Sequence, residues 1–160
     1  MKIRAYIFCI CVLINVISWA QNRKQIKENR VTTIMVTSTE NGKTINEKKS
    51  VYDSKGNEIE NVNYNKEGNV KSIHKTKYNS DNDETEDLEF DVNNKLIEKK
   101  ISKYNMLGEK TEEDFYDASN NLIKKNLFTY NGKGLKTERR TVDATGKVIS
   151  IKTYTYTFKK

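Results

Sequence analysis

The stretch VYDSKGNEIENVNYNKEGNV, residues Val51 to Val70, decides the fold of this chain because it contains one short motif twice. In each copy an aromatic residue is followed by Asp or Asn, two polar residues and Gly. Asp or Asn at the start of a turn bonds its side chain to backbone N–H groups further on, and the Gly accepts the positive φ of a left-handed position. The motif therefore predicts a tight hairpin turn.

The same turn motif recurs along most of the chain. Its anchor residues, which precede the Asp or Asn, lie alternately 14 and 12 residues apart, at Ser38, Tyr52, Tyr64, Tyr78, Phe90, Tyr104, Tyr116, Tyr130, Val142 and Tyr156. Four residues after each of the first nine anchors stands Gly or Asn: Gly42, Gly56, Gly68, Asn82, Asn94, Gly108, Asn120, Gly134 and Gly146. This alternation indicates a repeat of 26 residues with one longer and one shorter arm.

The arms between the turns have the composition of strands. Longer arms such as KLIEKKISKY carry Lys in their middle, whereas shorter arms such as DETEDLEF are acidic. Arms joined by tight turns pair antiparallel, so basic and acidic arms become neighbours and form cross-strand Lys–Glu pairs. With a first strand over Val31 to Thr37, the predicted fold is an all-β antiparallel meander of about ten strands. It is either an open, twisted single-layer sheet or a sheet that curls towards a barrel.

The composition limits the core of this sheet. The 160 residues include no Pro, 32% are charged and the mean hydropathy is −0.84, so the core is expected to be thin or extended. The aromatic anchors fall into two rows, one at each edge of the meander. We expect these rows to belong to the core rather than to form a platform for a ligand, because a Tyr ring covers the space beside a neighbouring Gly.

The first 20 residues, MKIRAYIFCICVLINVISWA, have the pattern of a secretory signal peptide. A basic start at Lys2 and Arg4 precedes an apolar run, and Ser18-Trp19-Ala20 fits the small-x-small cleavage rule. We therefore expect residues 1–20 to be removed, 21–30 to be a flexible, polar lead-in and 31–160 to form the β-repeat domain. No second apolar run follows, so no membrane span is expected after cleavage.

Cleavage would change the chemistry that the chain can offer. Cys9 and Cys11 are its only cysteines, so the mature chain would have no thiolate nucleophile and no Cys-ligated zinc. Loss of Lys2 and Arg4 from 29 basic residues leaves 27 against 22 acidic residues, a net charge of +5. This mild excess does not indicate a dedicated nucleic-acid binder.

Two turn segments resemble known repeats. Tyr52 to Asn57, YDSKGN, and Tyr116 to Leu122, YDASNNL, resemble the Tyr-Asp repeats of Rhs-type bacterial surface proteins and the MORN-variant repeats of exported bacterial proteins. The resemblance covers about Thr37 to Phe158. It implies a strand-rich repeat sheet exported from a bacterium, of a kind described as sugar- or envelope-binding, and it implies no catalytic residues.

The chain offers few groups for catalysis or metal binding. His74 is the only histidine, and the acidic stretch Ser80 to Asp87 lacks the central Gly and closing Glu of a helix-loop-helix calcium site. Carboxylates recur at one point of the shorter arms, at Glu60, Glu86, Glu112 and Glu138. Duplicated surface positions give such a row, whereas glycosidases need two carboxylates in different environments. We therefore predict no enzyme activity, no cofactor and no metal site.

The leading functional prediction is an exported, non-catalytic module or scaffold that binds an envelope glycan or another exported protein. Repeat sheets provide extended surfaces for such partners. The first alternative is a surface protein that binds a polyanion through a C-terminal basic patch formed by Lys124, Lys125, Lys136, Arg139, Arg140 and Lys152. The second alternative is an enzyme that acts on glycans. The sequence does not identify the partner.

Overall fold

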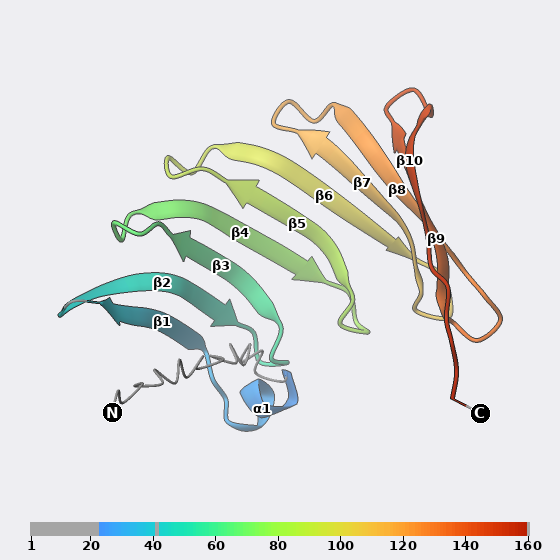
Figure 1. Ribbon diagram of the computed structural model, residues 1–160. Helices are drawn as coiled ribbons and strands as arrows, with labels where there is room; N and C mark the ends of the chain where they lie inside the picture. The colour runs from blue at the N-terminus through green and yellow to red at the C-terminus, as the bar shows by residue number, and fades with distance from the viewer. Residues whose placement is uncertain (1–22, 41, 160) are drawn as a thin grey trace, which may run out of the picture.

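The computed structural model describes residues 23–40 and 42–159, which form one short helix and one sheet of ten strands (Figure 1). Helix α1 is Arg23–Glu28. The strands are β1 (Thr33–Glu40), β2 (Lys43–Tyr52), β3 (Glu58–Tyr64), β4 (Val70–Tyr78), β5 (Glu84–Phe90), β6 (Leu96–Tyr104), β7 (Lys110–Asp117), β8 (Leu122–Tyr130), β9 (Lys136–Asp143) and β10 (Val148–Thr153). Each strand pairs antiparallel with the next in the order of the sequence.

This arrangement confirms the predicted all-β meander. Of the two forms that the sequence left open, the sheet takes the open one: it twists from β1 to β10 without closing (Figure 1). The expected signal peptide, residues 1–20, lies outside the described residues. No helix within the described ranges is long and apolar enough to cross a membrane.

The hairpin turns have the predicted chemistry. All nine Gly and Asn positions have a positive φ, from 60° at Asn94 to 90° at Gly146. At the turn between β2 and β3, the Gly56 N–H donates to the Asp53 carbonyl at 3.0 Å. Asp53 Oδ1 accepts the N–H groups of Lys55 and Asn57 at 2.8 and 2.9 Å. The same two side-chain bonds recur at Asn65, Asn79, Asp91, Asn105, Asp117, Asn131 and Asp143.

A second irregularity follows each of these eight turns. Beyond the turn at Asp53, Tyr52 faces Glu58 but Val51 faces Glu60, so Ile59 is an additional residue in its strand. The register shifts in the same way in every later hairpin. Such bulges increase the local twist. They also account for adjacent apolar residues that break the strict alternation of a strand, such as Leu96 and Ile97.

The sheet has two different faces. We call the side that carries Tyr52, Tyr78, Tyr104 and Tyr130 the tyrosine face, and the side that carries Val62, Leu88, Ile101 and Val142 the opposite face. The hydrophobic side chains that are buried among the described residues are Ile26, Val62, Phe128 and Val142. Six buried polar side chains accompany them, at Ser50, Asn57, Ser102, Asp114, Asn126 and Thr141. The core is thin, as the composition predicted.

The segment expected to be a flexible lead-in instead contains helix α1, which packs beneath the end of the sheet (Figure 1). Ile26, the apolar residue in the middle of α1, is only 1% exposed. The helix lies so close to the turn between β2 and β3 that a Cβ on Gly56 would stand 2.5 Å from the Arg23 carbonyl oxygen. A single buried side chain and a glycine contact therefore dock a segment that is otherwise polar.

Candidate functional site

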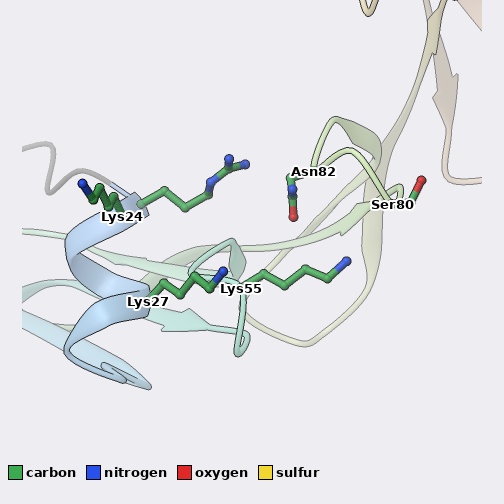
Figure 2. A pocket seen from close by; sticks show the side chains of 6 residues that line it. Lys24, Lys27, Lys55, Ser80 and Asn82 are labelled. Carbon is green, nitrogen blue, oxygen red and sulfur yellow. The ribbon is translucent and has the colours of Figure 1, made fainter.

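A basic cavity of about 440 Å³ lies between α1 and two hairpin turns. Its lining residues are Arg23, Lys24, Lys27, Lys55, Ser80 and Asn82. In Figure 2, Lys24 and Lys27 belong to α1, while Ser80 and Asn82 lie on the hairpin across the space. Four of these six described residues are basic and none is acidic. Basic side chains around a hollow concentrate a positive potential, which attracts anions.

The wall of the basic cavity is held by a bond between its two turns. Asn57, which is 4% exposed, donates from Nδ2 to Asn82 Oδ1 at 3.1 Å and to Asp53 Oδ2 at 3.0 Å. Asn82 occupies a left-handed turn position with a φ of 67°. The turn chemistry of the repeat therefore also fixes the spacing of the residues that line the cavity.

A groove of about 540 Å³ adjoins the basic cavity on the tyrosine face and shares Arg23 and Asn82 with it. The other residues that line the groove are Ile34, Val36, Lys48, Ser50, Tyr52, Gly56, Asn57, Glu58 and Tyr78. This combination of aromatic rings with a few amide, hydroxyl and charged groups is typical of sites for small polar ligands. The cavity and the groove together form our candidate binding site.

Glu58 and Tyr78 have shifted pKa values in this groove. Burial raises the pKa of Glu58, but hydrogen bonds from Asn61, Ser50 and Lys48 outweigh burial and hold the pKa below its usual value. Burial, assisted by the charges of Glu84 and Glu58, raises the pKa of Tyr78 to about 12. At neutral pH the groove therefore presents an ionised carboxylate and a neutral phenol.

The tyrosines of this row serve the sheet itself, as the sequence predicted. The hydroxyls of Tyr78, Tyr104, Tyr130 and Tyr156 each donate to the backbone carbonyl 20 residues earlier, at 2.7 to 2.9 Å. Tyr52 differs because its hydroxyl donates to the Glu58 carboxylate at 3.3 Å. Tyr52 is thus the member of the row whose hydroxyl bonds to a side chain of the groove.

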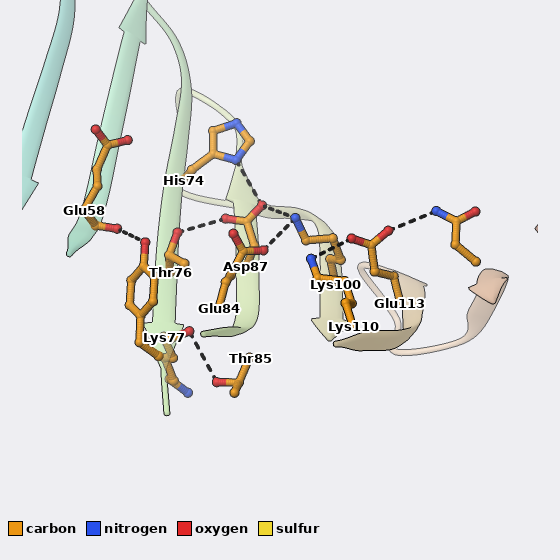
Figure 3. Close-up of polar contacts among 12 residues, drawn as sticks. Glu58, His74, Thr76, Lys77, Glu84, Thr85, Asp87, Lys100, Lys110 and Glu113 are labelled. Atoms are coloured by element: carbon orange, nitrogen blue, oxygen red, sulfur yellow. Dashed lines mark hydrogen bonds and ion pairs between the residues drawn. The ribbon is translucent and has the colours of Figure 1, made fainter. Parts of the chain in front are cut away.

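A polar network continues from the groove across the tyrosine face (Figure 3). Asp87 accepts from Thr76 at 3.3 Å and lies 3.5 Å from His74 Nδ1. Lys100 Nζ lies 2.7 Å from Glu84 and 3.7 Å from Asp87. Further along, Lys110 pairs with Glu113 at 2.9 Å, and Glu113 accepts from Asn126 at 3.0 Å. These side chains satisfy one another, so they stabilise the sheet and are less available to a ligand than those of the basic cavity.

The structure divides the predicted C-terminal patch between the two faces of the sheet. Lys124, Lys136, Arg139 and Lys152 lie on the tyrosine face, and Lys125 and Arg140 lie on the opposite face. Lys124 Nζ stands 4.5 Å from the Phe115 ring centroid, and Lys136 Nζ stands 4.3 Å from that of Phe128. Lys125 pairs with Glu112 at 2.9 Å, and Arg140 pairs with Glu138 at 3.0 Å. The six residues therefore do not form one basic surface.

The four recurring glutamates share the opposite face, as the 26-residue spacing predicted. Each lies near a basic side chain: Glu60 near Lys49 at 3.9 Å, Glu86 near Lys77 at 2.6 Å, Glu112 near Lys103 at 2.8 Å and Glu138 near Arg140 at 3.0 Å. The row therefore contributes to the predicted charge pairing between arms. No three His, Cys, Asp or Glu residues gather into a metal-binding group within the described part of the chain.

Sequence reasoning missed the basic cavity because it treated residues 21–30 as a flexible segment. The available signal was the spacing of basic residues around one apolar residue in RKQIK, residues 23–27. Residues four apart share one side of a helix, which brings Arg23 and Lys27 to the same side. The third basic element, Lys55, is remote in the sequence and reaches the cavity only through the fold.

Comparisons with known proteins reveal no family for this chain. Neither a family model nor a curated protein matches the sequence. Among solved structures, a protein of unknown function from Bacteroides fragilis is similar over 79% of this chain and 96% of its own, with a TM-score of 0.46 and 14% identity.

Two structures of TarM are also similar to part of this chain. One matches over 79% of this chain with a TM-score of 0.32 and 18% identity. The other, a mutant of S. aureus TarM in complex with Fondaparinux, alpha-GlcNAc-glycerol and UDP, matches over 78% with a TM-score of 0.31 and 18% identity. This chain spans 22% of the length of each TarM chain. The likeness to Rhs-type and MORN-variant repeats stays a prediction from the sequence.

Proposed function

We propose that this protein is an exported, non-catalytic β-repeat module that binds an anionic glycan of the cell envelope. The observation that carries the proposal is the basic cavity beside α1, which adjoins a groove lined by Tyr52 and Tyr78. A glycan with phosphate, sulfate or carboxylate groups combines the negative charge that suits the cavity with the sugar rings and hydroxyls that suit the groove.

The cavity supports the anionic part of the proposal. Arg23, Lys27 and Lys55 converge on it from two elements, and the Ser80 hydroxyl and the Asn82 amide supply neutral hydrogen-bonding groups. Arginine binds planar oxyanions through several N–H donors, and lysine supplies a mobile point charge. A single phosphate or carboxylate bound there would be neutralised without burying an unpaired charge.

The groove supports the glycan part of the proposal. Tyr52 and Tyr78 provide aromatic surface, while Asn57 and Glu58 provide an amide and a carboxylate that bind hydroxyl groups. Repeat sheets offer such sites along an extended surface, which suits a long polymer. Export is the expectation from residues 1–20, and the absence of catalysis is the expectation from the motif analysis.

Binding assays with matched acidic and neutral glycans test this function. The full chain is titrated with sulfated, phosphorylated or uronic-acid oligosaccharides and with the neutral parent of each. We expect binding of the acidic members, with an affinity that falls as salt is raised. The variant Lys27→Glu/Lys55→Glu should weaken this binding at least tenfold, because it reverses two charges in the cavity.

Two further variants control for charge and for location. Lys66→Glu/Lys95→Glu makes the same change in net charge at exposed turn positions and should alter the affinity less than twofold. Arg139→Glu/Arg140→Glu tests the C-terminal alternative and should also leave the affinity unchanged. Equal binding of the cavity variant and wild type, or loss only in the C-terminal variant, would overturn the proposed site.

A further inference from the structure

The two edge strands differ from the eight inner strands in their charge. β1, TIMVTSTE, contains one charged residue, Glu40, and β10, VISIKT, contains one, Lys152. Each inner strand contains between two and five. Natural sheets usually place charged residues, above all Lys, on their edges to prevent pairing with other chains. This sheet has the reverse distribution.

The edge strands also expose apolar side chains. On the opposite face, Met35 of β1 is 46% exposed and Ile151 of β10 is 52% exposed. Val148 and Ile149 of β10 are 47% and 59% exposed. Within the described residues no strand pairs with the outer side of β1 or of β10. Both edges thus combine unpaired backbone groups with β-branched, nearly uncharged sequence, which favours strand addition.

We propose that β10 of one copy pairs with β1 of the next copy, so that copies join head to tail into a continuous sheet. Every pair inside the sheet joins a longer arm to a shorter arm, and the arms alternate in direction. β10 ends the sheet as a longer arm and β1 begins it as a shorter arm. Their pairing continues both alternations, whereas β10–β10 or β1–β1 pairing joins two arms of the same kind.

This assembly would extend the properties of one copy. The tyrosine face of successive copies would lie on the same side, so the candidate binding sites would repeat along one surface. Met35 and Ile151 would cover each other on the opposite face, removing two exposed apolar side chains from water. A head-to-tail contact does not close on itself, so the products are a series of oligomers of increasing length.

Cross-linking of single-cysteine variants distinguishes the possible pairings. The full chain is prepared with Cys9→Ser and Cys11→Ser, and Met35→Cys or Ile151→Cys is added to that background. With a short bismaleimide, a mixture of the Met35→Cys and Ile151→Cys proteins should give a cross-linked dimer, whereas each protein alone should not. A chain that carries both cysteines should give a ladder of dimers, trimers and longer products.

Ile123→Cys is the matched control for exposure, because Ile123 is 43% exposed but lies in the inner strand β8. It should not cross-link with either edge variant. Sedimentation gives a second measurement: the average mass of wild type should rise with concentration, and Ile151→Lys should weaken the association at least tenfold while Ile123→Lys does not. Circular dichroism verifies that the lysine variants remain folded.

Three results would overturn head-to-tail pairing. Cross-linked dimers from either single variant alone would show that like edges pair. A wild type that remains monomeric at the highest soluble concentration would show that the edges do not pair. Equal association of Ile151→Lys and wild type would remove β10 from the contact. None of these results depends on glycan binding, because Met35 and Ile151 are not among the residues that line the groove.

Discussion

At the scale of single residues, this sheet is held together more by polar bonds than by buried carbon. Among the described residues, four buried hydrophobic side chains stand beside six buried polar ones. The tyrosine row shows how this works: a ring lies across the neighbouring strand and its hydroxyl bonds to a carbonyl of that strand. Each such residue contributes apolar contact and a hydrogen bond together.

Tyr104→Phe tests the contribution of the hydroxyl. This change removes the bond from Tyr104 to the Glu84 carbonyl at 2.9 Å while keeping the ring. We expect the free energy of unfolding in urea to fall by about 1 kcal/mol. Tyr64→Phe is the control, since the Tyr64 hydroxyl bonds to no described residue, and its effect should stay within about 0.5 kcal/mol. Equal effects of the two changes would contradict a structural role for the row.

Glu112→Gln tests the charge pairing between arms through its pH dependence. Hydrogen bonds from Lys103, and then from Lys125, lower the pKa of Glu112 from 4.5 to about 2. The unfolded chain therefore binds more protons than the native state between these pH values. The stabilisation by Glu112 is complete above about pH 4.5 and is lost as the pH falls towards 2.

Urea unfolding at pH 6, 4 and 3 measures this effect. The Gln variant should lose less stability than wild type on acidification, by an amount on the order of 1 kcal/mol after solvent screening. The double variant Lys103→Met/Glu112→Gln should cost less at pH 6 than the sum of its two single changes, because the two residues interact directly. The same pH dependence in wild type and Glu112→Gln would exclude this ion pair as its source.

At the scale of secondary-structure elements, the hairpin turn is the unit that recurs, and one of its copies has acquired a second role. Gly56 and Gly68 have almost the same φ, 81° and 85°, in turns of the same type. Only at Gly56 would an added Cβ meet another element, the backbone of α1. A six-residue helix is too short to be stable alone, so α1 depends on this contact and on Ile26.

Gly56→Ala and Gly68→Ala form a matched pair for this contact. Both substitutions place a side chain at positive φ, at a cost of about 1–2 kcal/mol. We expect Gly56→Ala to cost more and to expose α1, because a Cβ there would stand 2.5 Å from the Arg23 carbonyl oxygen. Proteolysis near Lys24 and Lys27 provides the measurement. If both variants protect α1 equally, the docking of α1 does not depend on the absence of a side chain at position 56.

At the scale of the whole molecule, the protein is a one-dimensional array. Extensive contacts between strands occur only between sequence neighbours, so each arm depends on the two arms beside it. The stability of such arrays is close to a sum over repeats and their interfaces, and the terminal units have one neighbour fewer. The sheet is therefore expected to lose its ends before its centre.

Hydrogen exchange measures this gradient directly. At a protein concentration where the chain is monomeric, amides of β5, β6 and β7 should be the most protected, and those of β1 and β10 the least. Raising the concentration should protect the edge strands selectively if copies pair through them. Uniform protection from β1 to β10 would mean that the sheet unfolds as one cooperative unit.

The sequence by itself determined the strands, their order and the turn at each anchor, because these features depend on residues close together in the chain. An Asp or Asn that bonds N–H groups two and four residues later, and a Gly or Asn at positive φ, act within six residues. Once tight turns join all the arms, antiparallel neighbours follow without further information. The pairing of basic with acidic arms follows for the same reason.

The tertiary structure decided whether the sheet closes, which residues share a face and where the basic cavity forms. The open form depends on the sum of many small twists and bulges, none of which the sequence states alone. The adjacent residues Lys124 and Lys125 point to opposite faces, so the predicted basic patch divides. The cavity combines α1 with turns about 30 and 60 residues further along the chain, because Gly56 and Ile26 dock the helix there. Such contacts between distant segments arise only when the whole chain is folded.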